Sequence, residues 1–345
     1  MAQIKLGIIG CGLISHAHAI AAQKSNERIK IVAAASRSDE KRHAWCAQYG
    51  AMAFENTAQM LAEMNLDGVI IATPPATHFE NMVSCIKAGA KAILCEKPLI
   101  TRIEDCVRLK EVATDANCTI LEGFMYRHHK AFQEFETTAQ SVGKLDTIFA
   151  EFNMKLTGSN DNWRQSDKAS GGIAFDFLCY VVDFCNLMAK SKPKSAFAFG
   201  RNNPNSGLLE NISGQVLYEN EIIATLRASQ NSSFSQKIIL SASAGQVEMP
   251  IGFAISDTAQ IITTRTEKFI DQQVSIKEVD IDEDDGTLIH SSAFAQQLRH
   301  FADIIEKGAP SLCGIDDALR NIEVTLALLS SIENRQPYLF ANESK

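Results

Sequence analysis

The first 120 residues alternate short apolar runs with segments whose apolar residues recur at helical spacing. The apolar runs are typical of parallel strands that are buried on both faces, and the segments between them are typical of amphipathic helices. This alternation predicts a doubly wound parallel sheet, the Rossmann type of α/β fold. The expected strands are Ile4–Ile9, Ile29–Ala35, Val69–Thr73, Ala92–Cys95 and Thr119–Leu121, and the expected helices are Leu13–Lys24, Asp39–Tyr49, Thr57–Met64, His78–Ala88 and Ile103–Asn117.

The pattern changes after about residue 123. Leu145–Leu156 alternates like a long half-buried strand, and Ile173–Met188 has helical spacing. Further on, short alternating segments predict an α+β domain on a large, mostly antiparallel sheet. We therefore expect two domains, residues 1–123 and 124–345, and we interpret the acidic run Glu278–Asp285 as a solvated loop. The remaining expected strands are Ala196–Gly200, Gly214–Leu217, Ile222–Ala228, Gln236–Ala242, Gln246–Ile251 and Gln260–Thr264, with helices at Ala293–Glu306 and Asp316–Ser331.

Composition narrows the class of protein. The 345 residues carry a formal net charge of −8, which argues against a nucleic-acid partner because binding a polyanion needs a basic surface. The chain starts in a strand pattern, so we expect no signal peptide, and no apolar run is long enough to cross a bilayer. The nine cysteines form no CxxC pair and no zinc-finger spacing. We expect a cytoplasmic protein with reduced cysteines and no metal site.

A glycine-rich loop follows the first expected strand. The segment Gly10-Cys11-Gly12-Leu13-Ile14-Ser15 is a GxGxxG pattern with Ser in the third glycine position. Gly10 permits a tight turn, and Gly12 lets a pyrophosphate approach the backbone at the start of a helix, whose free N–H groups attract an anion. Because the loop lies between a strand and a helix, we expect it to bind a dinucleotide; the alternative is a glycine turn without a ligand.

The end of the second strand favours NADP(H) over NAD(H). An NAD-binding chain usually has an acidic residue there, which binds the ribose 2′-hydroxyl. This chain has Ser36-Arg37 instead, a pair that can bind a 2′-phosphate by charge-assisted hydrogen bonds. The alternative is that Arg37 is an exposed loop residue without a role in cofactor selection and that the protein uses both cofactors.

Three further motifs follow the ends of later strands, where a doubly wound fold places its ligands. They are Thr73-Pro74-Pro75-Ala76-Thr77-His78, Cys95-Glu96-Lys97-Pro98 and the run Glu122–His129. A fourth segment begins at Gly171-Gly172 and continues through Asp176 and Tyr180. The residues expected to bind the cofactor are Gly10, Gly12, Leu13, Ile14, Ser36, Arg37, Thr73, Pro74, His78, Glu96 and Lys97.

In this order, the motifs resemble those of the Gfo/Idh/MocA oxidoreductase family across essentially the whole chain. The family pattern is GxGxxGxxH, then TPPxxH, then EKP, then a Gly-Gly segment that contains an Asp followed by a His or Tyr. In this chain the final His of the first motif is His18, and the last segment has Asp176 and Tyr180. Many members have His at the last position of this pattern. The Tyr at position 180 resembles the branch that contains glucose–fructose oxidoreductase, xylose dehydrogenase and dimeric dihydrodiol dehydrogenase. Three residues depart from the usual pattern: Gly123 stands for Ala, His128 for Phe, and Leu178 for a Gly.

The resemblance implies a reaction centre at Lys97 and Tyr180. Hydride chemistry belongs to the cofactor, and the protein must position the substrate and move one proton. A tyrosine, whose usual pKa is about 10, becomes an effective base only beside a cation. We expect Tyr180 to exchange the proton, with Lys97 as its electrostatic partner. The alternatives are that Lys97 is a surface lysine at a strand end and that Tyr180 is a core residue of a helix.

Asp176, Arg127 and Trp163 are the expected substrate-binding residues. In a helix Asp176 would lie one turn before Tyr180, on the same face; the alternative is a structural cap or ion pair. Arg127 could equally form an internal salt bridge. His78 lines the cofactor site or caps a helix, and the Lys97–Pro98 bond is either cis or trans.

Together with the Ser36-Arg37 pair, the resemblance thus implies an NADP-preferring oxidoreductase acting on a hydroxyl or carbonyl group of a sugar, polyol or related compound. Residues 1–123 would bind the dinucleotide, and residues 124–345 would bind substrate and form a homodimer or homotetramer through the sheet. Two alternatives stay open. One is a ketoreductase of a nucleotide-linked deoxysugar, and the other is a non-catalytic dinucleotide-binding regulatory protein.

Overall fold

The computed structural model of the chain describes residues 3–25, 27–156, 163–167, 169–255, 258–268, 271–280 and 291–341. The chain divides into two compact units. The first comprises Met1–His129 and Glu283–Leu319, and the second comprises Lys130–Asp282 and Arg320–Lys345. The sequence suggested a single boundary after residue 123, so the return of a late segment to the first unit was not foreseen.

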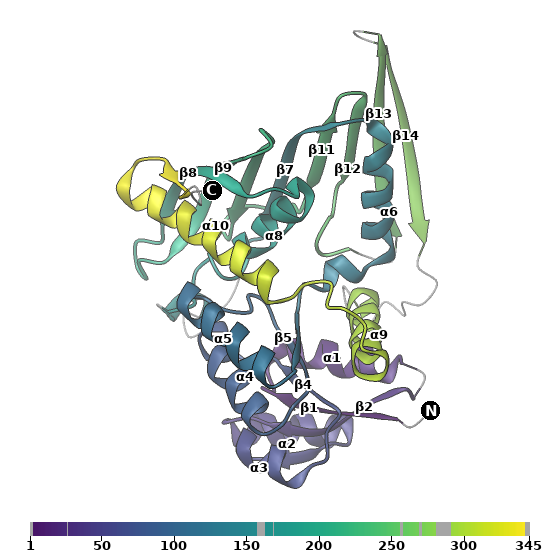
Figure 1. The fold of residues 1–345 in the computed structure, drawn as a ribbon, viewed down its shortest axis with the longest axis vertical. Helices are drawn as coiled ribbons and strands as arrows, with labels where there is room; N and C mark the ends of the chain where they lie inside the picture. Colours follow the sequence, from purple (N-terminus) through teal and green to yellow (C-terminus); the bar gives the residue numbers. More distant parts are fainter. Residues whose placement is uncertain are drawn as a thin grey trace. The chain divides into compact units, whose positions relative to one another are not determined.

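The first unit contains a six-stranded parallel sheet (Figure 1). Its strand order is β3-β2-β1-β4-β5-β6, the order of a dinucleotide-binding Rossmann fold. Strands β4 and β5 are wholly buried, which explains their continuous apolar sequences. The strands are β1 (Ile4–Ile9), β2 (Ile29–Ala35), β3 (Met52–Phe54), β4 (Gly68–Ile71), β5 (Ala92–Cys95) and β6 (Thr119–Glu122).

Helices cover both faces of this sheet. A Cβ at Gly7 would contact Met60 of α3, and a Cβ at Gly68 would contact Phe301 and Ile305 of α9. Helix α9 therefore covers the face opposite α3, and it packs there against α1. The helices are α1 (Leu13–Gln23), α2 (Asp39–Tyr49), α3 (Thr57–Glu63), α4 (His78–Lys87), α5 (Ile103–Asp115) and α9 (Ser291–Lys307), with 3₁₀ turns η1 (Pro75–Thr77) and η2 (Met125–His128).

The second unit is built on a nine-stranded sheet of order β14-β13-β12-β11-β7-β10-β9-β8-β15. All neighbouring strands are antiparallel except β7 and β10. The strands are β7 (Leu145–Asn153), β8 (Pro193–Asn202), β9 (Leu209–Tyr218), β10 (Ile223–Ser229), β11 (Ile238–Ala242), β12 (Gly245–Met249), β13 (Thr258–Lys268), β14 (Asp271–Asp280) and β15 (Tyr338–Leu339).

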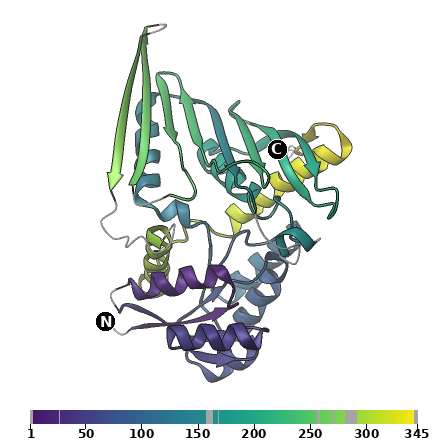
Figure 2. The same cartoon turned by 180° about the vertical axis from the view of Figure 1, so that it is seen from behind.

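Helices α6, α8 and α10 pack on one face of this sheet (Figures 1 and 2). Small residues let α10 approach closely, because a Cβ at Gly214 would lie 3.1 Å from Leu328 and one at Gly200 2.7 Å from Ile332. The other face carries exposed apolar side chains such as Val274 and Ile276. These helical elements are α6 (Lys130–Ala139), the 3₁₀ turn η3 (Gln140–Val142), α7 (Trp163–Ser166), α8 (Leu178–Ala189) and α10 (Ile315–Asn334).

The structure confirms the fold class and corrects several elements. Helix α8 begins at Leu178, five residues later than expected, because residues 174–177 form a turn. The interpretation of Glu278–Asp285 as a loop is wrong for its first residues, since Glu278–Asp280 belong to β14; residues 281–285 lie outside the described part. Strand β14 and helix α6 were not predicted. Among the described residues, no helix has both the length and the apolar character to cross a bilayer.

Candidate active site

The glycine loop between β1 and α1 has the geometry of a phosphate cradle. Gly10 has a positive φ of 101°, and a Cβ there would lie 2.6 Å from the Ala72 carbonyl oxygen. A Cβ at Gly12 would have no atom within 4 Å, and Leu13 is 87% exposed. Helix α1 starts without a side-chain cap and without an acid in its first turn. The open space above free N–H groups therefore fits a pyrophosphate.

Side chains behind this loop do not add negative charge to it. Burial raises the pKa of the Cys11 thiol to about 11, so the thiol is neutral at pH 7. The Ser15 hydroxyl donates a hydrogen bond to the Gly12 carbonyl, 2.5 Å away, and Ile14 is half-buried. The residues present thus fit the dinucleotide that the sequence predicts.

Ser36 and Arg37 follow β2 and precede α2. Ser36 is half-buried and Arg37 is exposed, so the guanidinium of Arg37 is accessible to a ligand. Arg42, which the sequence analysis did not select, is 5% exposed. One of its terminal nitrogens donates to the Ser36 carbonyl at 2.8 Å, and the other pairs with Asp39. Arg42 therefore holds the backbone of the segment expected to bind the 2′-phosphate.

The turn after β4 is fastened by His78. Thr73 and Pro74 are half-buried, and the Thr77 hydroxyl donates to Thr73 Oγ1 at 2.8 Å. His78 is fully buried, with Nε2 2.7 Å from the Thr73 carbonyl oxygen and Nδ1 2.9 Å from that of Pro98. Burial lowers the pKa of His78. Its ring links two strand ends; a direct contact of His78 with cofactor stays a prediction.

The turn after β5 carries Lys97. Glu96 is buried and its Oε1 lies 2.7 Å from Nε2 of His18 on α1. The Lys97–Pro98 peptide bond is cis, and Lys97 is half-buried. The next backbone N–H, that of Leu99, donates to Glu122 Oε1 at 2.7 Å. The strand-end motifs of the sequence therefore converge on the backbone around Lys97.

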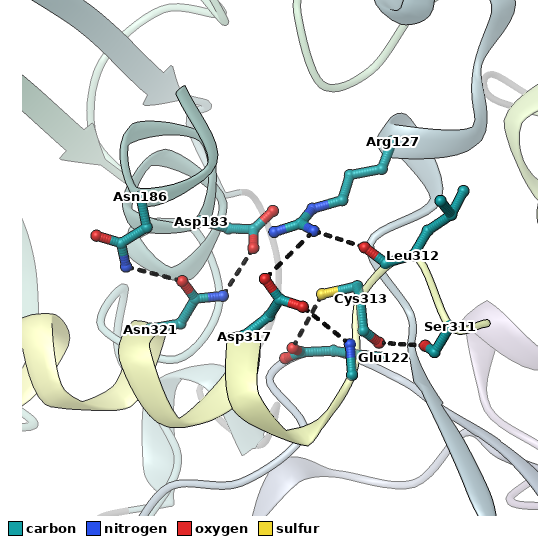
Figure 3. Close-up of polar contacts among 10 residues, drawn as sticks. Glu122, Arg127, Asp183, Asn186, Ser311, Leu312, Cys313, Asp317 and Asn321 are labelled. Atoms are coloured by element: carbon teal, nitrogen blue, oxygen red, sulfur yellow. Dashed lines mark hydrogen bonds and ion pairs between the residues drawn. The ribbon is translucent and has the colours of Figure 1, made fainter. Parts of the chain in front are cut away.

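Arg127 is 6% exposed and takes part in an internal network (Figure 3). Its guanidinium donates to the Leu312 carbonyl at 2.8 Å and lies 3.8 Å from Asp317 Oδ1. Arg127 therefore forms the internal salt bridge that the sequence left open as the alternative to substrate binding. A contact of Arg127 with substrate stays a prediction. The neighbouring His128 is neutral at pH 7, because burial lowers its pKa to about 3. Because the buried imidazole of His128 is uncharged, it can stand where the pattern of the resembled family usually has Phe.

In the second unit, Tyr180 lies on α8 among aromatic rings. It is 7% exposed, and its ring centroid lies 5.0 Å from that of Phe152 and 5.6 Å from that of Phe253. Leu178, at the position where the family usually has glycine, is fully buried. Packing on several sides fixes the orientation of the phenol.

Asp176 lies in the turn before α8, so the expected helical i, i+4 relation to Tyr180 is wrong. Its Oδ2 accepts a hydrogen bond from Arg164 Nε at 2.6 Å, and Asp176 is 3% exposed. The Arg164 guanidinium also lies 4.7 Å from the centre of the Trp163 ring. The structure thus joins Asp176 to Trp163 through Arg164, an ion pair that was the alternative reading of Asp176.

A buried polar chain lies further along α8 (Figure 3). Asn321 Nδ2 donates to Asp183 Oδ1 at 2.7 Å, and Asn186 Nδ2 donates to Asn321 Oδ1 at 2.9 Å. The Tyr218 hydroxyl donates to Asn186 Oδ1 at 2.9 Å. Sequence reasoning missed this polar network, although an Asp within the apolar run Leu178–Ala189 was a signal that it would be buried and paired. Within the described residues, no cluster of three or more His, Cys, Asp or Glu could hold a metal ion.

Family models match most of the chain. The model described as "Oxidoreductase family, NAD-binding Rossmann fold" matches residues 4–124. The model described as "GFO/IDH/MocA C-terminal domain" matches residues 137–248. The two matches fall on the six-stranded and nine-stranded sheets, respectively.

Similar curated proteins act on sugars and polyols. The chain is 26% identical to D-xylose 1-dehydrogenase (NADP(+)) 2 of Haloferax volcanii over 73% of this chain and 78% of that protein. It is 23% identical to scyllo-inositol 2-dehydrogenase (NAD(+)) of Bacillus subtilis over 97% and 96%. A dTDP-3,4-didehydro-2,6-dideoxy-alpha-D-glucose 3-reductase of Streptomyces violaceoruber is 27% identical over 55% of each chain.

Solved structures share the fold over nearly the whole chain. A 3-ketoreductase from Actinomadura kijaniata, solved with NADP and TDP-benzene, has a TM-score of 0.84 at 20% identity, covering 95% of this chain and 98% of its own. A putative NADPH-dependent oxidoreductase from Desulfitobacterium hafniense has a TM-score of 0.85 at 21% identity, covering 98% of both chains. At such identities the likeness concerns the fold.

Proposed function

Because the chain belongs to the Gfo/Idh/MocA oxidoreductase family, we propose that it transfers a hydride between NADP(H) and a hydroxyl or carbonyl group of a sugar or polyol. The observation that carries this proposal is the phosphate cradle, where Gly12 leaves open space above the uncapped start of α1. Ser36 and Arg37 at the end of the neighbouring strand supply a cation and no carboxylate, which favours NADP(H) over NAD(H).

Proton transfer is assigned to the chain's own residues. The nicotinamide ring, when bound, supplies the hydride chemistry. Tyr180 exchanges the proton with the reacting oxygen, and its ring is oriented for this by Phe152 and Phe253. Lys97 supplies the positive charge that stabilises a phenolate, and Asp176, Arg127 and Trp163 bind substrate hydroxyls.

Two variants test the proton-transfer assignment. Lys97→Met and Tyr180→Phe are each expected to lower turnover of D-xylose or an inositol with NADP⁺ by about 10²-fold or more. NADPH binding, followed by nicotinamide fluorescence, should stay within about threefold. Lys87→Met on α4 and Tyr338→Phe, both at exposed positions, are the matched controls. Near-normal turnover in either site variant refutes that residue's role.

Cofactor preference has its own test. Arg37→Asp places a carboxylate where a 2′-phosphate would lie, so the ratio of kcat/KM for NADP⁺ to that for NAD⁺ should fall by about 10²-fold. Lys87→Asp makes the same charge change on exposed α4 and should leave the ratio unchanged. An unchanged ratio in Arg37→Asp removes Arg37 from the argument.

A second candidate is a ketoreductase of a nucleotide-linked deoxysugar. It is favoured by the relative from Streptomyces violaceoruber, which is 27% identical over 55% of this chain. A panel of dTDP-linked ketosugars with NADPH, run beside the free sugars and inositols, separates the two. If neither panel oxidises or reduces the bound cofactor, a regulatory dinucleotide-binding protein becomes the better proposal.

The face of the nine-stranded sheet opposite α6, α8 and α10 is proposed to bind a second copy of the chain. Phe199, Val274 and Ile276 are 75%, 60% and 60% exposed, and such apolar groups are typical of association surfaces. Light scattering coupled to gel filtration should report a dimer or tetramer. Ile276→Lys should shift it to monomer, whereas Val107→Lys on α5 should leave it unchanged. A wild-type monomer at micromolar concentration refutes the proposal.

A further inference from the structure

The turn that carries Lys97 is bonded by three buried side chains of the first unit. They are His18 on α1, His78 at the start of α4 and Glu122 at the end of β6. Their contacts fall on Glu96, Pro98 and Leu99, the residues on either side of Lys97. Each of the three comes from a different part of the first 130 residues.

His18 and Glu96 form the contact before Lys97. The side chains are 0% and 8% exposed, and His18 Nε2 lies 2.7 Å from Glu96 Oε1. Because α1 begins at the phosphate cradle, this contact ties the turn of Lys97 to the helix that receives the pyrophosphate. This buried pair therefore contributes to the distance between the phosphate cradle and Lys97.

His78 forms the contact at Pro98. Its Nδ1 lies 2.9 Å from the Pro98 carbonyl oxygen and its Nε2 lies 2.7 Å from that of Thr73. Burial lowers the pKa of His78, so the ring is neutral and has one N–H to donate. The two ring nitrogens therefore compete for one proton, and only the Nδ1–H form donates to the turn of Lys97.

Glu122 forms the contact after Pro98. It is 1% exposed, and its Oε1 accepts the Leu99 N–H at 2.7 Å. Its Oε2 lies 3.5 Å from the Cys313 thiol (Figure 3). The backbone N–H of Glu122 donates to the Cys313 carbonyl at 2.8 Å. A buried carboxylate that accepts a backbone N–H makes a stronger bond than a neutral acceptor would. Glu122 thus fastens the turn to the segment that follows α9.

We infer that Glu122 and His78 are positioning residues for Lys97, holding its backbone so that the ammonium group meets the reacting oxygen. This inference rests on the proposed function of Lys97. A catalytic group displaced by about 1 Å loses about 10²-fold in rate, so these bonds act on turnover more than on cofactor affinity. Neither side chain is assigned a contact with substrate.

The first experiment needs no substrate. Trace acetylation of the protein with acetic anhydride, read by mass spectrometry, reports the reactivity of each lysine. In Glu122→Ala the turn is released, so acetylation of Lys97 should rise at least about fivefold, while that of exposed Lys87 stays constant. Glu122→Gln keeps an oxygen acceptor for Leu99 and should change Lys97 by less than about twofold. Equal Lys97 reactivity in the Ala variant and the wild type overturns the inference.

The second experiment uses turnover with NADP⁺ and D-xylose or an inositol. Glu122→Ala should lower kcat about 10²-fold with NADPH affinity within about threefold. Glu210→Ala removes a carboxylate that is also buried, 6% exposed on β9, and should lower kcat less than about threefold. Adding Glu122→Ala to Lys97→Met should cause no further loss, because the two act through one group. If the double variant instead loses kcat by the product of the two single losses, the inference is overturned.

Substitution of His78 provides an independent variant if Glu122→Ala does not fold. The amide nitrogen of Asn stands near the place of Nδ1, and that of Gln near the place of Nε2. His78→Asn should therefore retain the donor to Pro98 and at least about ten times the kcat of His78→Gln. The reverse order contradicts the inference. A wild type without any turnover, but with the acetylation difference, contradicts the proposed function alone.

Discussion

Gly123 allows a close approach between the end of β6 and the turn of Lys97. A Cβ on Gly123 would lie 2.9 Å from Glu96 Cα, 3.1 Å from the Cys95 carbonyl oxygen and 3.3 Å from Lys97 N. Carbon atoms in favourable contact are about 3.5–4.0 Å apart. All three neighbours are backbone atoms, so no flexible side chain can move aside. Gly123→Ala must therefore separate the two strand ends by about 0.6–1 Å.

This separation has two expected consequences. Overpacking of a well-packed site typically costs about 1–3 kcal/mol in the free energy of unfolding, which corresponds to a fall in Tm of about 2–10 °C. A shift of this size at Lys97 should also lower kcat about 10- to 100-fold. The perturbation is informative because the family usually has alanine here.

Calorimetry and turnover with NADP⁺ measure the two consequences separately. Gly314→Ala is the matched control, because a Cβ there would meet its nearest neighbour, Ser311 Cβ, at 3.8 Å, an ordinary contact. It should change neither Tm nor kcat. A Gly123→Ala variant with the Tm and kcat of the wild type would refute the packing argument. A variant that melts early but turns over normally would refute the link to Lys97.

Three further predictions concern other contacts. Arg42→Met removes the donor to the Ser36 carbonyl, so NADPH affinity should fall about tenfold by fluorescence titration while NADH affinity changes less. Asn321→Leu leaves the buried carboxylate of Asp183 without that donor, and denaturant titration should show a loss of about 1–3 kcal/mol. The hydrogen bond from Arg28 lowers the pKa of Asp303. Its stabilisation is therefore complete above the usual Asp pKa of about 3.9 and disappears as pH falls through the folded pKa, so Arg28→Gln should lower Tm at pH 7 but not near pH 2.

Most of the Rossmann sheet was predictable because its signals are local. Each expected strand of the first unit is present, and the side chains of Ser38 and Asn56 cap α2 and α3 by hydrogen bonds within their own helices. The strand-end motifs were also identifiable, because the carboxyl ends of parallel strands meet at one edge of the sheet. The glycine spacing, together with the strand before it and the helix after it, was sufficient to predict the phosphate cradle.

The features that sequence reasoning missed depend on distant partners. Strand β14 is mostly polar and exposed, and it is a strand because it pairs along β13. Helix α8 starts late because Asp176 bonds to Arg164 in a turn, whereas apolar periodicity continued through that turn. Glu122 was part of a recognised motif, but its bond to Leu99 joins residues 23 positions apart. Periodicity carries no information about such pairings.

The return of residues 283–319 to the first unit has a consequence for biosynthesis. Helix α9 covers β4 at Gly68, and Arg28 pairs with Asp303, 275 residues later. A ribosome adding about 5–20 residues per second needs about 10–40 s to pass from His129 to Leu319. Throughout that interval the face of the nascent Rossmann sheet at Gly68 lacks α9 and exposes apolar surface to water. The first unit therefore completes its folding only after Leu319 has been synthesised, and a fragment that stops at His129 should aggregate.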